Sequence, residues 1–312
     1  MTFARLFGAR PPRSQAPSGM ATIAGGTFWM GSDDHYAEER PRRRVKVAPF
    51  HIDLTPVTNA QFQAFVDATG YRTLAEHVPD PALYLDADPA LLKAGSLVFT
   101  GTSGPVPLND PLQWWTYRGG ARWDRPEGVG SHIQNRQGHP VVHIAHADAL
   151  AYAAWCDKRL PTEAEWEFAA RGGLDRAAYA WGDDLAPEGR MMANYWVGDF
   201  PWRRDQTSGW ERTSPVGSFA SNGFGLFDMI GNVWEWTSDD YSVGTDQDLV
   251  KRCCASDTRQ KTAFATKVLK GGSHLCAESY CRRYRPAARH PQTEDTSTSH
   301  IGFRCAKNVF PR

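Results

Sequence analysis

The chain has 312 residues, of which 41% are hydrophobic, and this is enough apolar material for a substantial core in one large domain or two. Its 35 basic and 35 acidic residues leave no net charge, which argues against binding to nucleic acid or to an anionic membrane through bulk charge. Its apolar runs fall short of the roughly 20 residues that a membrane-spanning helix needs. The 28 Gly, 21 Pro and 12 Trp residues are typical of a compact chain rich in turns.

Residues 1–20 are predicted to form a flexible tail in front of a single domain that covers residues 21–309. The tail carries arginines among Pro and Ser residues, lacks the continuous apolar stretch of a secretory signal, and ends at Met20, which is a candidate for an alternative start. We therefore expect the chain in the reducing cytoplasm, where structural disulfides are uncommon. No repeat of fixed period and no linker divides the remaining sequence, which favours one domain.

The first predicted elements are two strands and a helix. Partial alternation of apolar and polar residues predicts strands over 22–30 and 44–53. A helix follows, because apolar residues recur at helical spacing between Thr58 and Gly70. Thr58 and Gln61 are spaced as a capping box, and Gly70 is the expected stop. We expect this helix to be scaffold.

Two stretches of the sequence show neither helical nor strand periodicity. The run EERPRRR at 38–44 is predicted to be a solvated loop. Residues 75–138 are long and irregular, which is often the mark of a binding surface. Trp114, Trp115 and Trp123 lie in this segment and suggest a groove for an extended peptide, with packing as the alternative and favoured role of each ring.

A second capped helix is predicted over 162–170, with Thr162 and Glu165 as its capping box. Its three glutamates, Glu163, Glu165 and Glu167, are candidate general acids or bases by residue type alone. Their place on a capped helix favours roles in the cap and on the surface instead.

The likeliest chemical centre is the segment LKGGSHLCAESYCRRYRPAAR at 269–289, which places Cys276 and Cys281 five residues apart. Two thiolates on a short loop can hold a soft metal such as Cu(I), form a disulfide, or act as a redox pair. The arginines that follow the second cysteine favour the thiolate form. A CxxxxC spacing alone leaves all three chemistries open, together with a merely structural disulfide.

Four further segments accompany this loop in the same order and at the same spacing as in one known family. They are GGTFWMGSDD at 25–34, KRLPTEAEWEFAARGG at 158–173, NGFGLFDMIGNVWEWTSD at 222–239 and HIGFRC at 300–305. With the cysteine loop, they resemble the formylglycine-generating enzymes, also called sulfatase-modifying factors, from about residue 23 to residue 307. The resemblance implies an α+β fold, a single-domain variant of the C-type lectin fold with little regular secondary structure.

The resemblance also implies an oxidoreductase that acts on another protein. It would convert the cysteine of a CxPxR-type motif in an unfolded sulfatase to Cα-formylglycine, with O₂ as acceptor and an external thiol as reductant. Cys276 and Cys281 would hold Cu(I), and the substrate thiolate would join them as a third sulfur ligand. Ser273, Trp234 and Tyr280 match positions beside the oxygen pocket, where core packing is the alternative role for the two rings.

Two structural Ca²⁺ ions are a further implication of the resemblance. The first would be bound by Asn194, Tyr195, Ser208 and Trp210. The second would be bound by Asp228, Gly231, Val233 and Glu235. Ser208 stands where the animal enzymes supply an aspartate, and a neutral hydroxyl attracts Ca²⁺ less, so we expect the first site to be weak or empty. The alternative for both stretches is a tight loop held by hydrogen bonds.

The resemblance assigns no firm role to the four other cysteines. A disulfide between Cys156 and Cys305 is conceivable, because Cys156 lies nearly one helical turn beyond the position at which secreted members place the partner of Cys305. Cys253 and Cys254 lie in the polar run KRCCASD and stay unassigned.

Two other function classes stay open. One is a non-catalytic, lectin-like binding module, against which the two loop cysteines argue. The other is an iron-dependent sulfoxide synthase of the ergothioneine type, which shares this domain. That activity would need a histidine-rich helical domain in front of the segment that begins at residue 23.

Overall fold

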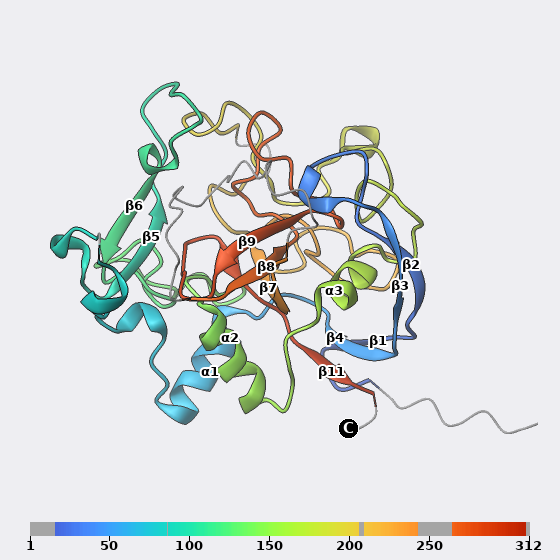
Figure 1. The fold of residues 1–312 in the computed structure, drawn as a ribbon, viewed down its shortest axis with the longest axis horizontal. Helices are drawn as coiled ribbons and strands as arrows, with labels where there is room; N and C mark the ends of the chain where they lie inside the picture. Colours follow the sequence, from blue (N-terminus) through green and yellow to red (C-terminus); the bar gives the residue numbers. More distant parts are fainter. Residues whose placement is uncertain (1–15, 86, 206–208, 243–263, 310–312) are drawn as a thin grey trace, which may run out of the picture.

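The computed structural model describes residues 16–85, 87–205, 209–242 and 264–309 (Figure 1). The α-helices of this part are α1 (Asn59–Thr69), α2 (His146–Trp155) and α3 (Glu163–Ala170). Single turns of 3-10 helix are η1 (Ala37–Glu39), η2 (Leu74–Glu76), η3 (Pro81–Leu83), η4 (Pro89–Leu91), η5 (Pro111–Gln113) and η6 (Pro187–Gly189). Short strands and many turns make up the rest, so the predicted α+β fold with little regular secondary structure is confirmed.

A four-stranded sheet lies at the centre of the molecule (Figure 1). Its strands, in spatial order, are β10 (Ile301–Gly302), β7 (Trp234–Asp240), β8 (Thr266–Lys270) and β9 (Arg289–Thr293). The pair β10 and β7 is parallel, and the other pairs are antiparallel. The cysteine loop joins β8 to β9, so this sheet anchors both of its ends.

Three smaller sheets surround this centre. The three-stranded sheet contains β1 (Met20–Ile23), β4 (Phe50–Asp53) and β11 (Ala306–Asn308). The two hairpin-like pairs are β2 (Gly26–Met30) with β3 (Arg43–Val47), and β5 (Gly95–Phe99) with β6 (Trp115–Gly119). The predicted strands 22–30 and 44–53 are thus each divided between two sheets. Gly25 explains the first break, because its φ is +69° and a Cβ there would lie 2.4 Å from Val47 O.

Both predicted capping boxes are confirmed. In α1, Thr58 Oγ1 accepts from Gln61 N–H, Gln61 Oε1 accepts from Thr58 N–H, and Gly70 ends the helix at a φ of 67°. In α3, Thr162 and Glu165 exchange the same pair of bonds. These elements were predictable because each cap is satisfied within a few residues of chain.

The surface role predicted for Glu163 and Glu167 is wrong, because both side chains are buried in an ion-pair network under α3. Lys270, which is fully buried on β8, places its Nζ 3.0 Å from Glu167 and 3.6 Å from Glu163. Glu167 forms a second ion pair with Arg171, and Glu163 forms a second ion pair with Arg289. Since α3 packs against β2, β3, β7 and β8, buried charge on this helix has to be paired across elements.

The predicted solvated loop at 38–44 is also wrong in its first part. Glu38 and Glu39 are buried at the end of η1, where they form ion pairs with Arg283 and Arg285 of the cysteine loop. The arginines of the run continue into β3, and Arg44 lies over the ring of Trp29. These two ion pairs therefore connect η1 to the cysteine loop.

The aromatic residues of the irregular segment are packed, which confirms the packing alternative. Trp123 lies in the main core against Phe62. Trp114 and Trp115 lie in a second apolar cluster near the cysteine loop.

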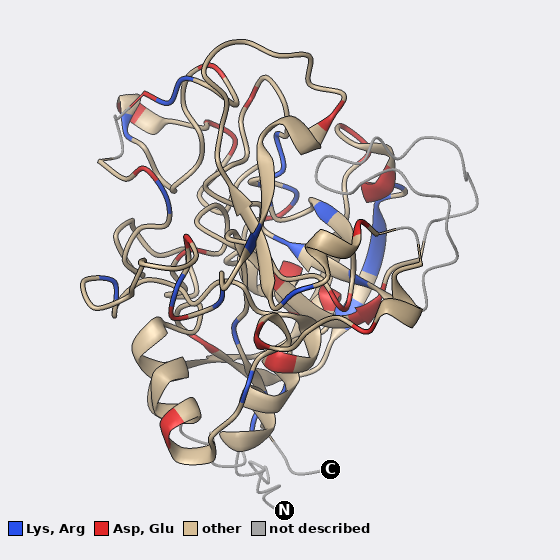
Figure 2. Cartoon of the chain, turned by 90° about the vertical axis from the view of Figure 1, so that its left-hand side faces the viewer, with Lys and Arg blue, Asp and Glu red and all other residues tan. Residues whose placement is uncertain are grey.

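Acidic and basic residues are interspersed along the ribbon (Figure 2). Within the described ranges, none of the helices combines the length and the apolarity that crossing a membrane requires.

Candidate active site

Cys276 and Cys281 lie side by side in the loop after β8, with their sulfur atoms 3.3 Å apart. Both are unbridged, and they are 2% and 1% exposed. The loop can fold back because Gly272 has a φ of +72° and no side chain. A Cβ there would lie 2.7 Å from Arg283 O. Cys281 N–H donates to Ala277 O, which closes the turn that brings the two sulfurs together.

A small, mostly aromatic cavity surrounds the cysteine pair. Its walls are Trp114, Trp115, Phe200, Trp234, Ser273, Leu275, Cys276, Tyr280, Cys281 and His300. Tyr280 stacks on Phe200 with ring centres 4.7 Å apart and meets Trp114 edge to face. The site residues predicted around the cysteines, Ser273, Trp234 and Tyr280, therefore lie in one place. An apolar wall excludes water and strengthens the few polar contacts inside it.

The polar groups of the cavity come from Ser273 and His300. Ser273 Oγ accepts from Leu275 N–H at 3.2 Å and lies 3.3 Å from His300 Nδ1. Burial lowers the pKa of His300 to about 3, so its imidazole is neutral at neutral pH. Sequence reasoning missed His300, although it stands in the quoted HIGFRC segment. Its place beside Ser273 follows from the pairing of β10 with β7, which no local pattern shows.

Each sulfur has a hydrogen-bond donor beside it. Ser273 N–H donates to Cys276 Sγ at 3.4 Å, and Arg283 Nη1 donates to Cys281 Sγ at 3.7 Å. Donors and positive charge of this kind favour negative sulfur. Arg282 donates to Tyr179, and Arg285 donates to Glu39. Among the contacts that the structure describes, Arg283 is therefore the loop arginine that donates to a cysteine sulfur.

The predicted copper ligands fit a soft monovalent ion. The two sulfurs are adjacent, buried, unbridged and set in an apolar wall. Cu(I) is a soft ion that prefers sulfur ligands of this kind to hard oxygen ligands. No group of three or more His, Cys, Asp or Glu side chains within the described ranges is arranged to hold a metal. A metal centre at this position would therefore use the two cysteine sulfurs as its ligands from the described residues.

The donor set predicted for the first Ca²⁺ does not fit this ion. The guanidinium of Arg204 lies among the expected ligands, where Nη2 donates to Asn194 Oδ1 at 2.8 Å and to Tyr195 O at 3.2 Å. Trp210 packs against His139. Ser208 lies outside the described residues. A positive charge already holds two of the oxygens that the metal would need, those of Asn194 and Tyr195.

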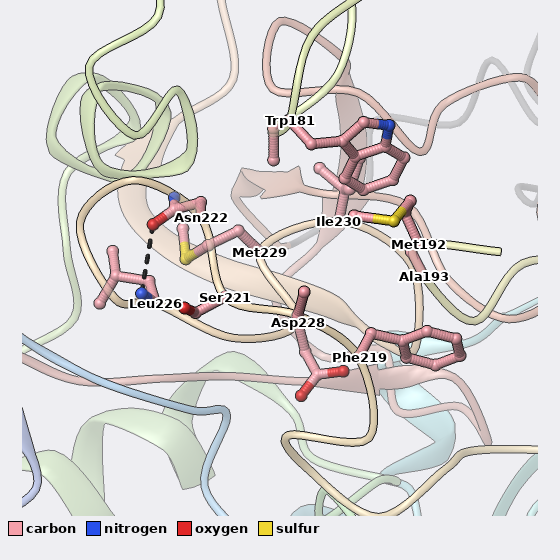
Figure 3. Close-up of a pocket in the computed structure, with 12 residues that line it drawn as sticks. Trp181, Met192, Ala193, Phe219, Ser221, Asn222, Leu226, Asp228, Met229 and Ile230 are labelled. Atoms are coloured by element: carbon pink, nitrogen blue, oxygen red, sulfur yellow. Dashed lines mark hydrogen bonds between the residues drawn. The ribbon is translucent and has the colours of Figure 1, made fainter. Parts of the chain in front are cut away.

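The second predicted Ca²⁺ set fits better, because it contains two buried carboxylates, those of Asp228 and Glu235. Burial raises the pKa of Asp228, and the charge of Glu235 adds to the rise. Arg304 neutralises one of the two charges by pairing with Glu235. Both Glu235 oxygens accept from Arg304, so Asp228 is the acidic residue of this set that would mainly attract a cation. Gly231 has a φ of +76° in the turn before β7, and Val233 directly precedes that strand. Asp228 lies at the wall of a small pocket (Figure 3).

The remaining cysteines are separate from this centre. Cys156 and Cys305 are unbridged but adjacent, and a hydrogen bond with the Cys305 thiol lowers the pKa of Cys156. The bridge considered from the sequence is therefore not formed in this structure. Cys253 and Cys254 lie outside the described residues.

Fold and site together define a class of protein: a single α+β domain that carries a buried pair of cysteines, not bridged by a disulfide, in an aromatic cavity. The family model of the sulfatase-modifying factor enzyme 1-like domain matches residues 6–309, and the chain belongs to this family.

Individual relatives agree with this assignment. The chain is 54% identical over 289 residues to the formylglycine-generating enzyme of Mycobacterium tuberculosis, which covers 92% of this chain and 96% of that protein. It is 46% identical over 309 residues to the formylglycine-generating enzyme of Thermomonospora curvata, at 95% coverage of both. The solved structure of PvdO from Pseudomonas aeruginosa has the same fold, with a TM-score of 0.61 over 93% of this chain and 94% of that chain, at 23% identity.

Proposed function

We propose that this chain converts a cysteine of a sulfatase polypeptide to Cα-formylglycine, within a CxPxR-type motif. The observation that carries the proposal is the pair of unbridged cysteine sulfurs 3.3 Å apart in a buried aromatic cavity. The two relatives described above, both named formylglycine-generating enzymes, support the same reaction. A merely lectin-like binding module would have no use for two buried thiols with a donor beside each.

Cys276 and Cys281 would hold Cu(I), which would supply a site for the reduction of O₂. The overall reaction balances as one substrate cysteine, one O₂ and two external thiols giving one aldehyde, one H₂S, one water and one disulfide. The substrate β-carbon is oxidised and loses its C–S bond. The external thiols supply the two further electrons that complete the reduction of O₂.

The side chains around the sulfurs have three tasks in this proposal. Trp234 and Tyr280 form walls that exclude water from the reacting sulfur and carbon atoms. Arg283 and the backbone N–H of Ser273 hold negative charge on the two sulfurs. Where His300 Nδ1 carries the proton, it donates to Ser273 Oγ and leaves the hydroxyl proton free to donate to a reduced oxygen species.

We also propose that Asp228, Gly231, Val233 and Glu235 bind one structural Ca²⁺. The two buried carboxyl groups of Asp228 and Glu235 support this. A reducing compartment such as the cytoplasm suits a centre whose chemistry needs two unbridged thiols.

The test is to incubate Cu(I)-loaded protein with a peptide that contains Cys-Thr-Pro-Ser-Arg under air and a thiol reductant, and to record the peptide mass. We expect the cysteine to become an aldehyde, and both Cys276→Ser and Cys281→Ser to abolish this conversion. Cys156→Ser is the matched control, because it removes a thiol outside the cavity and should keep the activity. An unchanged peptide mass despite confirmed copper loading would refute the proposal for this motif.

A further inference from the structure

Arg204 is a buried cation with its own set of oxygen acceptors. Its guanidinium donates to Asn194 Oδ1 at 2.8 Å, to His274 O at 3.0 Å, and to Tyr195 O and Glu211 O at 3.2 Å each. The side chain also lies over the ring of Trp196, 5.4 Å from its centre. We name these four oxygen atoms the Arg204 cage.

The cage is built to receive a positive charge. Three of its members are main-chain carbonyl oxygens, and the fourth belongs to the fully buried Asn194. Asn194 Nδ2 donates to Arg212 O, which fixes the amide so that Oδ1 faces the guanidinium. The distances are those of hydrogen bonds and exceed the 2.3–2.6 Å of calcium–oxygen bonds. Burial lowers the pKa of Arg204 only to about 10, so the group is positive at neutral pH.

The cage also connects to the cysteine loop. His274, whose carbonyl Arg204 binds, stands two residues before Cys276. On the other side of Arg204, Trp196 N–H donates to Cys276 O at 3.0 Å, and Trp196 forms an isolated β-bridge with Ala277. Arg204 therefore joins the segment that begins at Asn194 to the first limb of the loop that carries both thiols.

We propose that Arg204 is a built-in cation that replaces a Ca²⁺ ion at this position and holds the cysteine loop in place through His274. A metal ion in the same cage would meet the guanidinium charge and would find its oxygens already occupied. Arg204 is thus a positioning residue for Cys276 and Cys281, because it touches neither sulfur. The inference does not depend on the reaction that the two thiols perform.

Calcium content tests the replacement, with Ca²⁺ alone as the probe. Wild-type protein equilibrated with excess CaCl₂ and then desalted should retain no more than one ion per chain. The Asp228→Gly variant, which removes the side-chain oxygens of the other proposed site and tolerates the φ of 52° at this position, should retain none. A full equivalent of calcium in Asp228→Gly, or two equivalents in the wild type, would overturn the replacement by Arg204.

Thiol alkylation resolved by mass spectrometry tests the positioning. In Arg204→Ala, Cys276 and Cys281 should react roughly tenfold faster or more, because a charge-assisted clamp on their loop is lost. Cys305 is equally buried but lies outside this loop, and its rate should stay unchanged. The neighbouring Arg203→Ala removes an exposed arginine paired with Asp199 and should change none of the three rates.

The pattern of rates separates positioning from general support of the fold. Equal acceleration at all three cysteines in Arg204→Ala would overturn the positioning role, as would unchanged rates. Should Arg204→Ala fail to accumulate as folded protein, Arg204→Lys serves the same test. Lysine keeps the positive charge but lacks the planar guanidinium that donates to four acceptors. Cys276 and Cys281 should therefore again react faster than in the wild type, while the rate of Cys305 should stay unchanged.

Discussion

Glu38 Oε1 accepts hydrogen bonds from Nε and Nη2 of Arg283, at 3.1 Å and 2.6 Å, although the two residues stand 245 positions apart in the sequence. Both side chains are buried, and the guanidinium also lies over the ring of Tyr36, 4.0 Å from its centre. These contacts hold the third nitrogen, Nη1, against Cys281 Sγ. The beginning of the chain thus decides the electrostatic surroundings of a cysteine near its end.

Glu38→Ala should lower the free energy of unfolding by about 3 to 5 kcal/mol, because it removes the buried carboxylate that pairs with the buried charge of Arg283. Urea-induced unfolding measures the change. Glu188→Ala is the control, since Glu188 and its partner Arg190 are largely exposed, and it should change stability by less than about 0.5 kcal/mol. A loss below about 1 kcal/mol in Glu38→Ala would contradict the role assigned to this ion pair.

Ser273→Ala should lower kcat for the proposed conversion by roughly 10² to 10³, because a hydroxyl that could stabilise negative charge on reduced oxygen is removed. Cu(I) binding should persist, since both thiols stay. Ser279→Ala is the matched control, because Ser279 is exposed on the same loop. Equal kcat values for Ser273→Ala and the wild type would exclude the hydroxyl from the reaction.

Addition of Ca²⁺ should raise the thermal unfolding temperature of the wild type. Binding to the folded state alone contributes about 2.7 kcal/mol when the free ion exceeds its dissociation constant a hundredfold. Differential scanning calorimetry with chelator and with CaCl₂ measures the shift. Asp228→Gly, which removes the side-chain oxygens, should abolish it, and a wild-type unfolding temperature that does not respond to Ca²⁺ would contradict the proposed site.

Asp148 should make the stability depend on pH in a predictable direction. Its carboxylate accepts from Ala145 N–H at the start of α2 and from Tyr71 and Leu74. Burial nevertheless raises its pKa from 3.8 to about 6. The folded state therefore binds a proton that the unfolded state has already lost between these two values, and Asp148 lowers stability progressively as pH rises through this window.

Asp148→Asn, which cannot ionise, should gain stability relative to the wild type as pH rises from 4 to 7. A pKa rise of about two units corresponds to about 3 kcal/mol in this comparison. Urea unfolding of both proteins at each pH measures the difference, and all other titrating groups cancel. Parallel stability curves would show that burial of Asp148 does not shift its ionisation.

The elements that sequence reasoning placed correctly are those specified by a few neighbouring residues. Thr58 with Gln61, and Thr162 with Glu165, define helix starts because both partners of each capping box lie within one turn. The strands over 22–30 and 44–53 were expected in the right places, but their division was not. That division depends on the close approach of Gly25 to Val47, which is a contact between two strands.

The same distinction runs through the candidate site. The spacing of Cys276 and Cys281 and the family motifs around them are properties of the sequence, and they sufficed to single out the loop that carries both thiols. Charged residues were misjudged where their partners are remote. Glu38, Glu163 and Glu167 carry the local pattern of surface residues, and only the tertiary structure brings arginines and lysine to neutralise them in the core.

By itself, the sequence determined the residue types available to the site, the two helix caps and the short loop that carries both thiols. The tertiary structure decided which groups surround those thiols. It brought His300 to Ser273, Arg283 to Glu38, and Arg204 to the oxygens expected to bind a metal. The physical reason is that a buried charge or polar group must be satisfied by whatever lies beside it in space, and that neighbour is set by packing of the whole chain rather than by local spacing.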